Sequence, residues 1–307
     1  MQIIFLTYQN RSGSTFLANQ LSRHKNILVC PEAEILVSIF LQNPNLKFKD
    51  NKENVRKIEN KLQNDLKFKF WNLTNLHLSN LTNFENFVNI LTQYKNKTKP
   101  EAEILLFKSD RLIHLFDRIQ NQNTRFISII RDPRAVFLSQ KNTIGSWQKP
   151  MNTNPINSAV NWEIFVEKSN QFSQNHKSFY QLKYENLITN FDTEFNQVLL
   201  FIFNNNVDIT QLSVEGDLFE RLPNFQKHFH TNITQKPIIE NIEKWKTELS
   251  EFEIAIIEKI AKKSIILNNY ECLKIKFRIS NFSEFCCFIS KHFFTNLKSK
   301  IKNLIHK

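Results

Sequence analysis

Residues 3–21 of this chain read IIFLTYQNRSGSTFLANQL and decide the fold that we expect. The apolar run at 3–6 predicts a buried strand, and the residues from Phe16 onward predict a helix. Between them lies a polar loop with one glycine, three hydroxyls and an arginine: Arg11, Ser12, Gly13, Ser14 and Thr15. Backbone N–H groups at a helix N-terminus lack intrahelical partners and carry partial positive charge. The loop is therefore suited to hold an anion such as phosphate.

The same loop has a simpler interpretation as a capped helix start, with Ser12 or Ser14 as the N-cap. Gly13 is one of only three glycines, beside Gly145 and Gly216, which favours a close approach between backbone and ligand at this point. The loop is not the phosphate loop of ATP-binding proteins. That motif needs a second glycine and a Lys-[Ser/Thr] pair whose hydroxyl holds magnesium, and both are missing.

The composition is that of a folded protein. The chain has 307 residues, of which 41% are hydrophobic, enough for one large or two small domains. Its 41 basic residues exceed its 29 acidic ones and give a net charge of +12, which favours anionic partners such as a nucleotide or an acidic acceptor. No zinc-finger spacing or RNA-binding aromatic signature occurs, so we expect no nucleic-acid partner.

The sequence favours a cytoplasmic location. Residues 1–8 hold no basic n-region, long apolar core or cleavage site of a signal peptide and are better explained as a strand. No run of about 18 uncharged apolar residues occurs, so we expect no membrane-spanning helix. The four cysteines form no disulfide framework, and this fits a reducing compartment. They are Cys30, Cys272, Cys286 and Cys287.

Five short β-like runs are separated by helical patterns, which predicts an α/β fold with a mainly parallel five-stranded sheet flanked by helices. The runs are residues 3–8, 27–30, 104–108, 126–130 and 179–183. Continuous apolar runs of this kind are typical of strands that are buried on both faces. Ligands of such sheets gather at the carboxyl ends of the strands, so the polar residues that follow each run matter most.

The rest of the chain predicts helices around this sheet. Residues 45–99 form a polar helical insertion, with helices expected at 55–70 and 84–94, and residues 143–157 resemble a loop. Further helices are expected at 161–172 and 191–203, and one or two at 240–267.

The last segment differs in character from the rest. We place one domain at 1–273 and a basic amphipathic tail at 274–307, which has lysines but no acid from residue 285 onward. Such a helix can lie on an anionic membrane surface. The alternative is a terminal helix that docks on the protein itself.

A second polar motif follows the fourth run, where residues 131–139 read RDPRAVFLS. Asp132 suits an N-cap and Pro133 the first position of a helix. Arg131 is then left at the strand end, with Ser139 on the helix behind it. An arginine fork and a hydroxyl can hold a phosphate together. For Arg131 taken alone, a structural salt bridge is the alternative.

Together the two motifs resemble the sulfotransferase superfamily, whose sulfuryl donor is 3′-phosphoadenosine 5′-phosphosulfate (PAPS). In that family a P-loop-like Arg/Lys-Ser-Gly-[Ser/Thr]-[Ser/Thr] loop holds the 5′-phosphosulfate. An Arg with a Ser eight positions later holds the 3′-phosphate. The resemblance implies that residues 11–15 bind one end of PAPS, and that Arg131 and Ser139 bind the other. It is closest to tyrosylprotein sulfotransferases and their bacterial relatives, and it covers most of residues 1–273.

The resemblance also implies which residues react. His24 and the stretch at 30–32 resemble the segment that carries the acidic catalytic base of the family, with Glu32 as the candidate and Glu34 as a competitor. Lys108 is similar to the strand-end lysine that contacts the reacting sulfate.

Other matches concern the nucleotide. Tyr184 resembles a tyrosine of the family after the last strand and is expected to contact the nucleotide. Thr231, Lys236 and Lys244 resemble the segment that closes over the donor, although the spacing to Lys244 is one residue shorter. Arg134 stands where a second arginine often follows, and its role stays open.

The expected reaction moves a sulfuryl group from PAPS to a hydroxyl, either of a tyrosine in a protein or peptide or of a saccharide. Arg11, Lys108 and the loop amides can stabilise the charge on the leaving phosphate, so no metal is expected. The acceptor proton needs a base, for which Glu32 is the candidate. A P-loop-type nucleotide kinase and a non-catalytic nucleotide-binding protein remain as alternatives.

Overall fold

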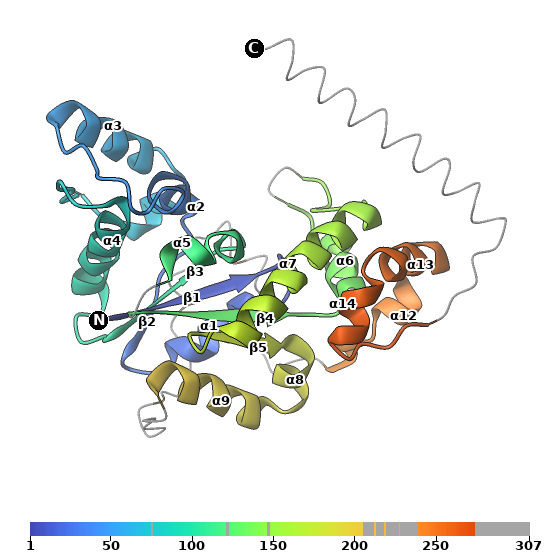
Figure 1. Cartoon of the computed structure of the whole chain (residues 1–307). Coiled ribbons are helices and arrows are strands. Elements are labelled where there is room, and N and C mark those ends of the chain that lie inside the picture. Colours follow the sequence, from blue (N-terminus) through green and yellow to red (C-terminus); the bar gives the residue numbers. More distant parts are fainter. Residues whose placement is uncertain are drawn as a thin grey trace, which may run out of the picture.

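The computed structural model describes residues 1–74, 76–120, 123–145, 148–204, 212, 218, 227 and 239–273. Its centre is a five-stranded parallel sheet with the strand order β2-β3-β1-β4-β5 (Figure 1). The strands are β1 (Gln2–Tyr8), β2 (Ile27–Val29), β3 (Ile104–Lys108), β4 (Thr124–Ile130) and β5 (Phe179–Lys183). The predicted α/β fold is confirmed, and each of the five predicted runs forms a strand.

Helices cover both faces of this sheet (Figure 1). The α-helices are α1 (Ser14–Ser22), α2 (Glu34–Leu36), α3 (Lys52–Gln63), α4 (Asn83–Thr98), α5 (Phe116–Ile119), α6 (Pro133–Asn142), α7 (Pro155–Asn175), α8 (Tyr184–Thr189), α9 (Phe191–Phe203), α12 (Trp245–Glu248), α13 (Glu251–Ile260) and α14 (Lys262–Leu267). Four short helical turns are η1 (Val37–Leu41), η2 (Phe68–Trp71), η3 (Leu112–His114) and η6 (Ile239–Ile242). No helix of the described residues is long and apolar enough to span a membrane.

The central strand β1 shows why the sheet is buried on both faces. Ile3 and Phe5 lie in the apolar cluster that the sheet shares with α4 and α7. Ile4 and Leu6 point the other way, into the cluster that it shares with α1 and α9. Successive side chains of a strand alternate between faces, so a continuous apolar run is buried only when both faces are covered.

The insertion at residues 45–99 is helical, but its first helix ends earlier than predicted. We expected a helix over 55–70, whereas α3 ends at Gln63 and the short turn η2 follows. The cause is Asp65, whose carboxylate accepts hydrogen bonds from the backbone N–H groups of Lys67 and Phe68 and so starts a new turn. The second helix, α4, begins at a Thr82–Glu85 capping box and extends past the predicted end.

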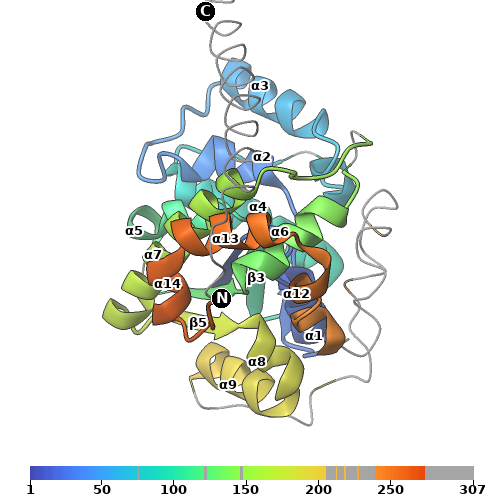
Figure 2. The ribbon, with the colours of Figure 1, turned by 90° about the vertical axis from the view of Figure 1, so that its right-hand side faces the viewer.

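Two other boundaries also differ from the prediction. Pro155, which we placed in a loop, is the first residue of α7, and the Asn154 side chain caps this helix. The segment expected to hold one or two helices divides into η6, α12, α13 and α14. Ser250 and Glu253 form a capping box that starts α13, and only two residues separate it from the end of α12. Figure 2 shows α12 and α13 beside α6, against which both helices pack.

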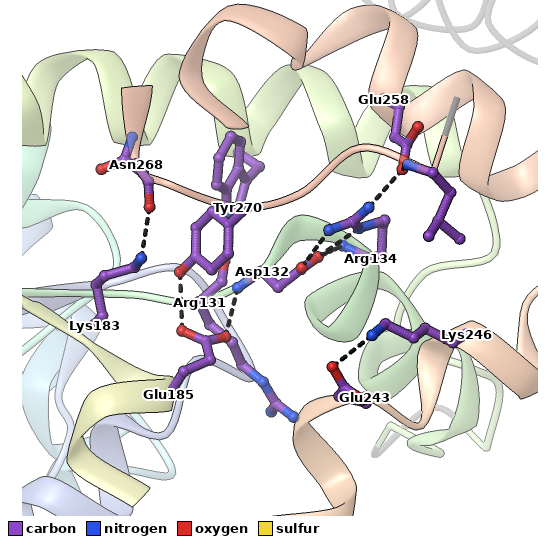
Figure 3. A network of polar contacts seen from close by, with 12 residues as sticks. Arg131, Asp132, Arg134, Lys183, Glu185, Glu243, Lys246, Glu258, Asn268 and Tyr270 are labelled. Carbon is purple, nitrogen blue, oxygen red and sulfur yellow. Dashed lines mark hydrogen bonds and ion pairs between the residues drawn. The ribbon is translucent and has the colours of Figure 1, made fainter. Parts of the chain in front are cut away.

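Arg134 forms a buried ionic network between α6 and these C-terminal helices (Figure 3). Its side chain is 1% exposed. Nε and Nη2 donate to the Asp132 carboxylate at 2.9 and 2.6 Å, and Nη1 donates to Glu258 of α13 at 2.5 Å. The guanidinium also lies 3.7 Å from the centre of the Trp245 ring. The role that the sequence left open is therefore structural, because Arg134 holds the start of α6 against α12 and α13.

Glu185 extends this network towards α8 (Figure 3). Its carboxylate accepts hydrogen bonds from the Asp132 backbone N–H and from the Tyr270 hydroxyl, both at 2.9 Å. Burial raises the pKa of Glu185 above its ordinary value. The short segment at 270–273 is thus held at the carboxyl edge of the sheet, because Tyr270 bonds to Glu185 and the Leu273 backbone N–H bonds to Glu258.

We expect Arg134→Met to lower the free energy of unfolding by about 3–5 kcal/mol, because it leaves two buried carboxylates without their cation. Urea denaturation measures the loss. The matched control is Lys141→Met, which breaks a more exposed ion pair with Glu253 and should cost less than about 1 kcal/mol. Equal losses in the two variants would contradict a structural role for the Arg134 network.

Candidate active site

The loop after β1 has the backbone shape of an anion-binding turn. Arg11 and Gly13 both have left-handed φ angles, of 78° and 87°, and the Ser12 backbone N–H donates to the Gln9 carbonyl. Helix α1 begins at Ser14 with Gly13 as its N-cap. The interpretation with a serine cap is therefore wrong. A glycine cap has no side-chain oxygen for the first amides of α1, and these amides are the groups that an anion binds.

Gly13 also makes room for the aromatic ring of Tyr184. A Cβ atom at Gly13 would lie 2.4 Å from Cδ2 of this ring, which no side chain tolerates. Tyr184 is the first residue of α8, directly after β5. The Arg131 guanidinium lies over the same ring, 4.3 Å from its centre. The tyrosine therefore lies against both the loop and Arg131, next to the place where the sequence predicted the nucleotide.

Arg131, Arg11 and Ser139 come together as one cationic group. Arg131 follows β4 and donates to the backbone carbonyls of Arg11 at 3.0 Å and Asn241 at 3.1 Å. Nε of Arg11 donates to the Ser139 hydroxyl at 3.1 Å. Burial lowers the pKa of Arg11, and the nearby charge of Arg131 lowers it further. Two guanidinium groups held this close, of which Arg131 is buried and Arg11 half-buried, favour an anion between or beside them.

The placement of Arg11 differs from what the resemblance implied. Arg11 was expected at the phosphosulfate end and Ser139 at the 3′-phosphate end, yet their side chains are hydrogen-bonded. The left-handed backbone at Arg11 accompanies a side chain that reaches Ser139 of α6.

Arg131 has a donor that is left over. Its Nε is buried and has no hydrogen-bond partner among the described residues, and a ligand can satisfy a donor of this kind.

Lys108 and Glu32 form a second group on the other side of the loop. Lys108 ends β3, is 2% exposed, and donates to the Thr15 hydroxyl at 3.0 Å. Its Nζ also lies 2.5 Å from Oε1 of Glu32, which follows β2. The Tyr8 hydroxyl donates to the same oxygen at 3.0 Å, while Lys67 of the insertion lies 2.9 Å from Oε2.

The two acids proposed as bases have opposite electrostatic surroundings. Burial by itself raises the pKa of Glu32, but the charges of Lys108 and Lys67 outweigh it and hold that pKa well below its ordinary value. Burial raises the pKa of Glu34 to about 7, although a hydrogen bond from the Ser109 hydroxyl at 2.7 Å opposes the shift. Carboxyl groups with pKa values pushed apart in this way are typical of acid–base sites.

The other predicted residues do not join these groups. His24 precedes β2 while Glu32 follows it, so His24 lies at the opposite edge of the sheet, where its Nδ1 accepts from the Asn26 N–H. Lys244 forms an exposed ion pair with Glu248 at 3.1 Å and makes no described contact with Arg131. Thr231, Lys236 and the tail at 274–307 lie outside the described residues.

Two residues of the site were missed at the sequence level. Tyr8 stands at the carboxyl end of β1, and this position was a signal that we did not use. Lys67 lies in the insertion, 35 residues from Glu32, and no local pattern distinguishes it from the other lysines there. In the part of the chain that the structure describes, no group of three or more His, Cys, Asp or Glu side chains could hold a metal.

We expect Gly13→Ala to lower the free energy of unfolding by at least about 1 kcal/mol, because alanine disfavours a left-handed φ and its Cβ meets the Tyr184 ring. Thermal or urea denaturation measures the loss. In a Tyr184→Ala background the clash disappears and only the backbone cost remains, so the loss should be smaller. The same loss in both backgrounds would show that the ring does not press on the loop.

The comparison with known sequence families points the same way as the two motifs. A sequence profile of the sulfotransferase family matches residues 4–202, which is more than half of the chain. No curated protein sequence gives a significant match. Solved structures that resemble the chain include the sulfotransferase domain of the Synechococcus PCC 7002 olefin synthase, with 18% identity, coverage of 85% of this chain and 94% of that chain, and a TM-score of 0.49.

Two further structures illustrate the range of the likeness. The sulfotransferase domain from the curacin biosynthetic pathway is 16% identical over 88% of this chain and 98% of that chain, with a TM-score of 0.50. Mouse sulfotransferase SULT7A1, solved in complex with PAP, is 11% identical over 88% of this chain and 89% of that chain, with a TM-score of 0.44. At such identities the curacin domain supports the fold alone. The family profile spans the loop, Glu32, Lys108, Arg131 and Tyr184, and the chain therefore belongs to the sulfotransferase family.

Proposed function

We propose that this chain transfers a sulfuryl group from PAPS to an acceptor hydroxyl. The observation that carries the proposal is the pair of cationic groups on the two sides of the loop at 11–15. Arg131 bonds to the Arg11 carbonyl on one side, and Lys108 bonds to the Thr15 hydroxyl on the other. PAPS carries a phosphate on the 3′ oxygen of its ribose and a phosphosulfate on the 5′ oxygen. It therefore offers one anionic group to each of the two cationic groups.

The chemistry is an in-line transfer. The bond between sulfur and the phosphate oxygen of PAPS breaks, and a bond between sulfur and the acceptor oxygen forms. The phosphate leaves with the electron pair and additional negative charge, which Lys108 and the amides at the start of α1 are placed to stabilise. The acceptor proton passes to a carboxylate, and the desulfated nucleotide PAP is the second product.

We assign the base to Glu32 because it shares Lys108 with the loop. A phosphosulfate bound at Thr15 would compete with the Glu32 carboxylate for Lys108, whose Nζ contacts both residues. Donor binding would thereby release a carboxylate oxygen beside the sulfur. Glu34 is the competing base, because its pKa of about 7 suits proton transfer at neutral pH.

The acceptor is proposed as a tyrosine of an acidic protein or peptide, or as a saccharide hydroxyl. The net charge of +12 favours an acidic peptide, and so does the resemblance to tyrosylprotein sulfotransferases. A sugar fits the same chemistry, because the base needs only a hydroxyl. We also propose residues 1–273 as the catalytic domain of a cytoplasmic enzyme. The basic tail at 274–307 is then available for peripheral contact with an anionic membrane.

Donor recognition is tested by calorimetry with PAP and AMP, which differ only in the 3′-phosphate. We expect Arg131→Met to weaken PAP binding about 10- to 100-fold and to leave AMP binding unchanged, since one charge-assisted contact is lost. The matched control is Arg56→Met on the exposed face of α3, which should change neither affinity. Equal affinities of the native chain for PAP and AMP would contradict the assignment of Arg131.

Transfer is tested by incubating the chain with ³⁵S-labelled PAPS and a cell extract, then measuring label in the protein and saccharide fractions. Glu32→Gln should lower the rate about 10²- to 10⁴-fold and preserve PAP binding, because a general base is lost. If Glu34 is the base instead, Glu34→Gln shows that loss, and the native rate falls as the pH drops below about 7.

The same experiment separates the alternative functions. Label in protein favours tyrosine as the acceptor, and label in saccharide favours a sugar. A chain that binds PAP but transfers no label to either fraction is a non-catalytic nucleotide-binding protein. Magnesium-dependent turnover of ATP without sulfuryl transfer would identify a kinase.

A further inference from the structure

The insertion at residues 45–99 contributes a charged side chain to the site. Nζ of Lys67 lies 2.9 Å from Oε2 of Glu32, and the lysine side chain is 33% exposed. The other carboxylate oxygen, Oε1, accepts from Lys108 and from the Tyr8 hydroxyl. Each lysine therefore has an oxygen of its own. Lys108 can leave Glu32 without disturbing the contact that Lys67 makes.

Lys67 is held in place by the packing around it. The Asp65 carboxylate accepts from its backbone N–H at 3.0 Å, and the next residue, Phe68, is buried and stacks on Trp71 with ring centres 5.6 Å apart. Trp71 in turn contacts Phe107, the residue before Lys108, with ring centres 6.5 Å apart. The two lysines thus come from segments that pack on each other.

The charges around Glu32 make the second lysine consequential. Lys108 from β3, Tyr8 from β1 and Lys67 from the insertion contact the carboxylate. The Glu34 and Asp110 carboxyls lie near these groups. The Glu32 side chain is only 16% exposed, so the loss of Lys108 alone would leave a poorly solvated anion close to other acids.

Glu34 shows what happens to such a carboxyl without a close lysine. It lies two residues from Glu32, its nearest cation among the described residues is the Arg111 guanidinium at 3.8 Å, and burial raises its pKa to about 7. A Glu32 carboxyl in that condition would be only partly ionised at neutral pH. The fraction of molecules whose Glu32 can accept the acceptor proton would fall accordingly.

We propose that Lys67 is a positioning residue that keeps the Glu32 carboxylate ionised and oriented when Lys108 turns to the bound donor. This inference rests on the proposed function and gives the insertion a part in it. Lys67 acts through Glu32 and is not assigned any contact with the sulfuryl group.

The test follows the ionisation of Glu32 in the PAP complex, which needs no acceptor. The side-chain carboxyls are labelled with ¹³C, and the signal that is missing in Glu32→Gln is titrated by NMR with PAP at saturation. In the native chain we expect this carboxyl to stay ionised down to about pH 5. In Lys67→Met its titration should move up by at least about two pH units, because the cation that stays beside Glu32 when Lys108 turns to the donor is lost.

Two variants serve as controls. Lys67→Arg keeps the charge and should restore the native titration. Lys69→Met removes an exposed lysine of the same turn and should leave the titration unchanged. Lys67→Gln replaces Lys67→Met if the methionine variant does not fold.

The outcomes separate this inference from the function on which it rests. If native chain binds PAP and Glu32 titrates alike in native and Lys67→Met, the role of Lys67 is wrong and the proposed function stands. A titration in Lys67→Arg that matches Lys67→Met would also refute it. If calorimetry shows that the native chain does not bind PAP, the proposed function fails, and the role of Lys67 falls with it.

Discussion

The parallel direction of all five strands is the constraint on which the site depends. Neighbouring strands lie about 4.8 Å apart, so residues that follow their carboxyl ends gather along one edge. Each strand contributes one such residue to the site: Tyr8 at the end of β1, Glu32 after β2, Lys108 at the end of β3, Arg131 after β4 and Tyr184 after β5. An antiparallel arrangement would send about half of them to the opposite edge.

This edge concentrates positive charge in partly buried positions. Arg11 and Arg131 are close enough for the charge of one to lower the pKa of the other, and Lys108 and Lys67 share a single carboxylate. Like charges held together in a protein interior raise its free energy, and a bound anion relieves this repulsion. The left-handed backbone of Arg11 adds local strain at the same place. Both features indicate a scaffold that is arranged for an anionic ligand.

Arg131 and Arg134 are only three residues apart, but their contacts differ. Arg134 is enclosed by the carboxylates of Asp132 and Glu258, so its charge is neutralised where it lies. Arg131 bonds to two backbone carbonyls, and no carboxylate of the described residues pairs with it. Its positive charge is therefore not neutralised by these contacts and remains available to the donor that we propose. The Arg134 network supports that position from behind, because Asp132 also connects to α8 through Glu185.

The sequence by itself determined the local features. Apolar runs and turn residues predicted all five strands. This prediction succeeds because strand burial depends on residues close together in the chain. The two motifs and the family resemblance named the loop, Arg131, Ser139 and Tyr184 as donor-binding residues, and the structure brings Arg131 into contact with the loop and with Tyr184. Two errors arise where neighbouring residues compete for the same position in a helix end or a helix cap. Asp65 ends α3 early, and Gly13 takes the cap position that a serine was expected to occupy.

Only the tertiary structure decided which partner each charged side chain meets. Lys67 reaches Glu32 across 35 residues of sequence, Arg11 turns to Ser139, and Arg134 is neutralised by Glu258 from 124 residues away. The opposite pKa shifts of Glu32 and Glu34 follow from such contacts, although the two acids are separated by one alanine. Charge interactions act through space, and the sequence does not contain the distances until the chain has folded.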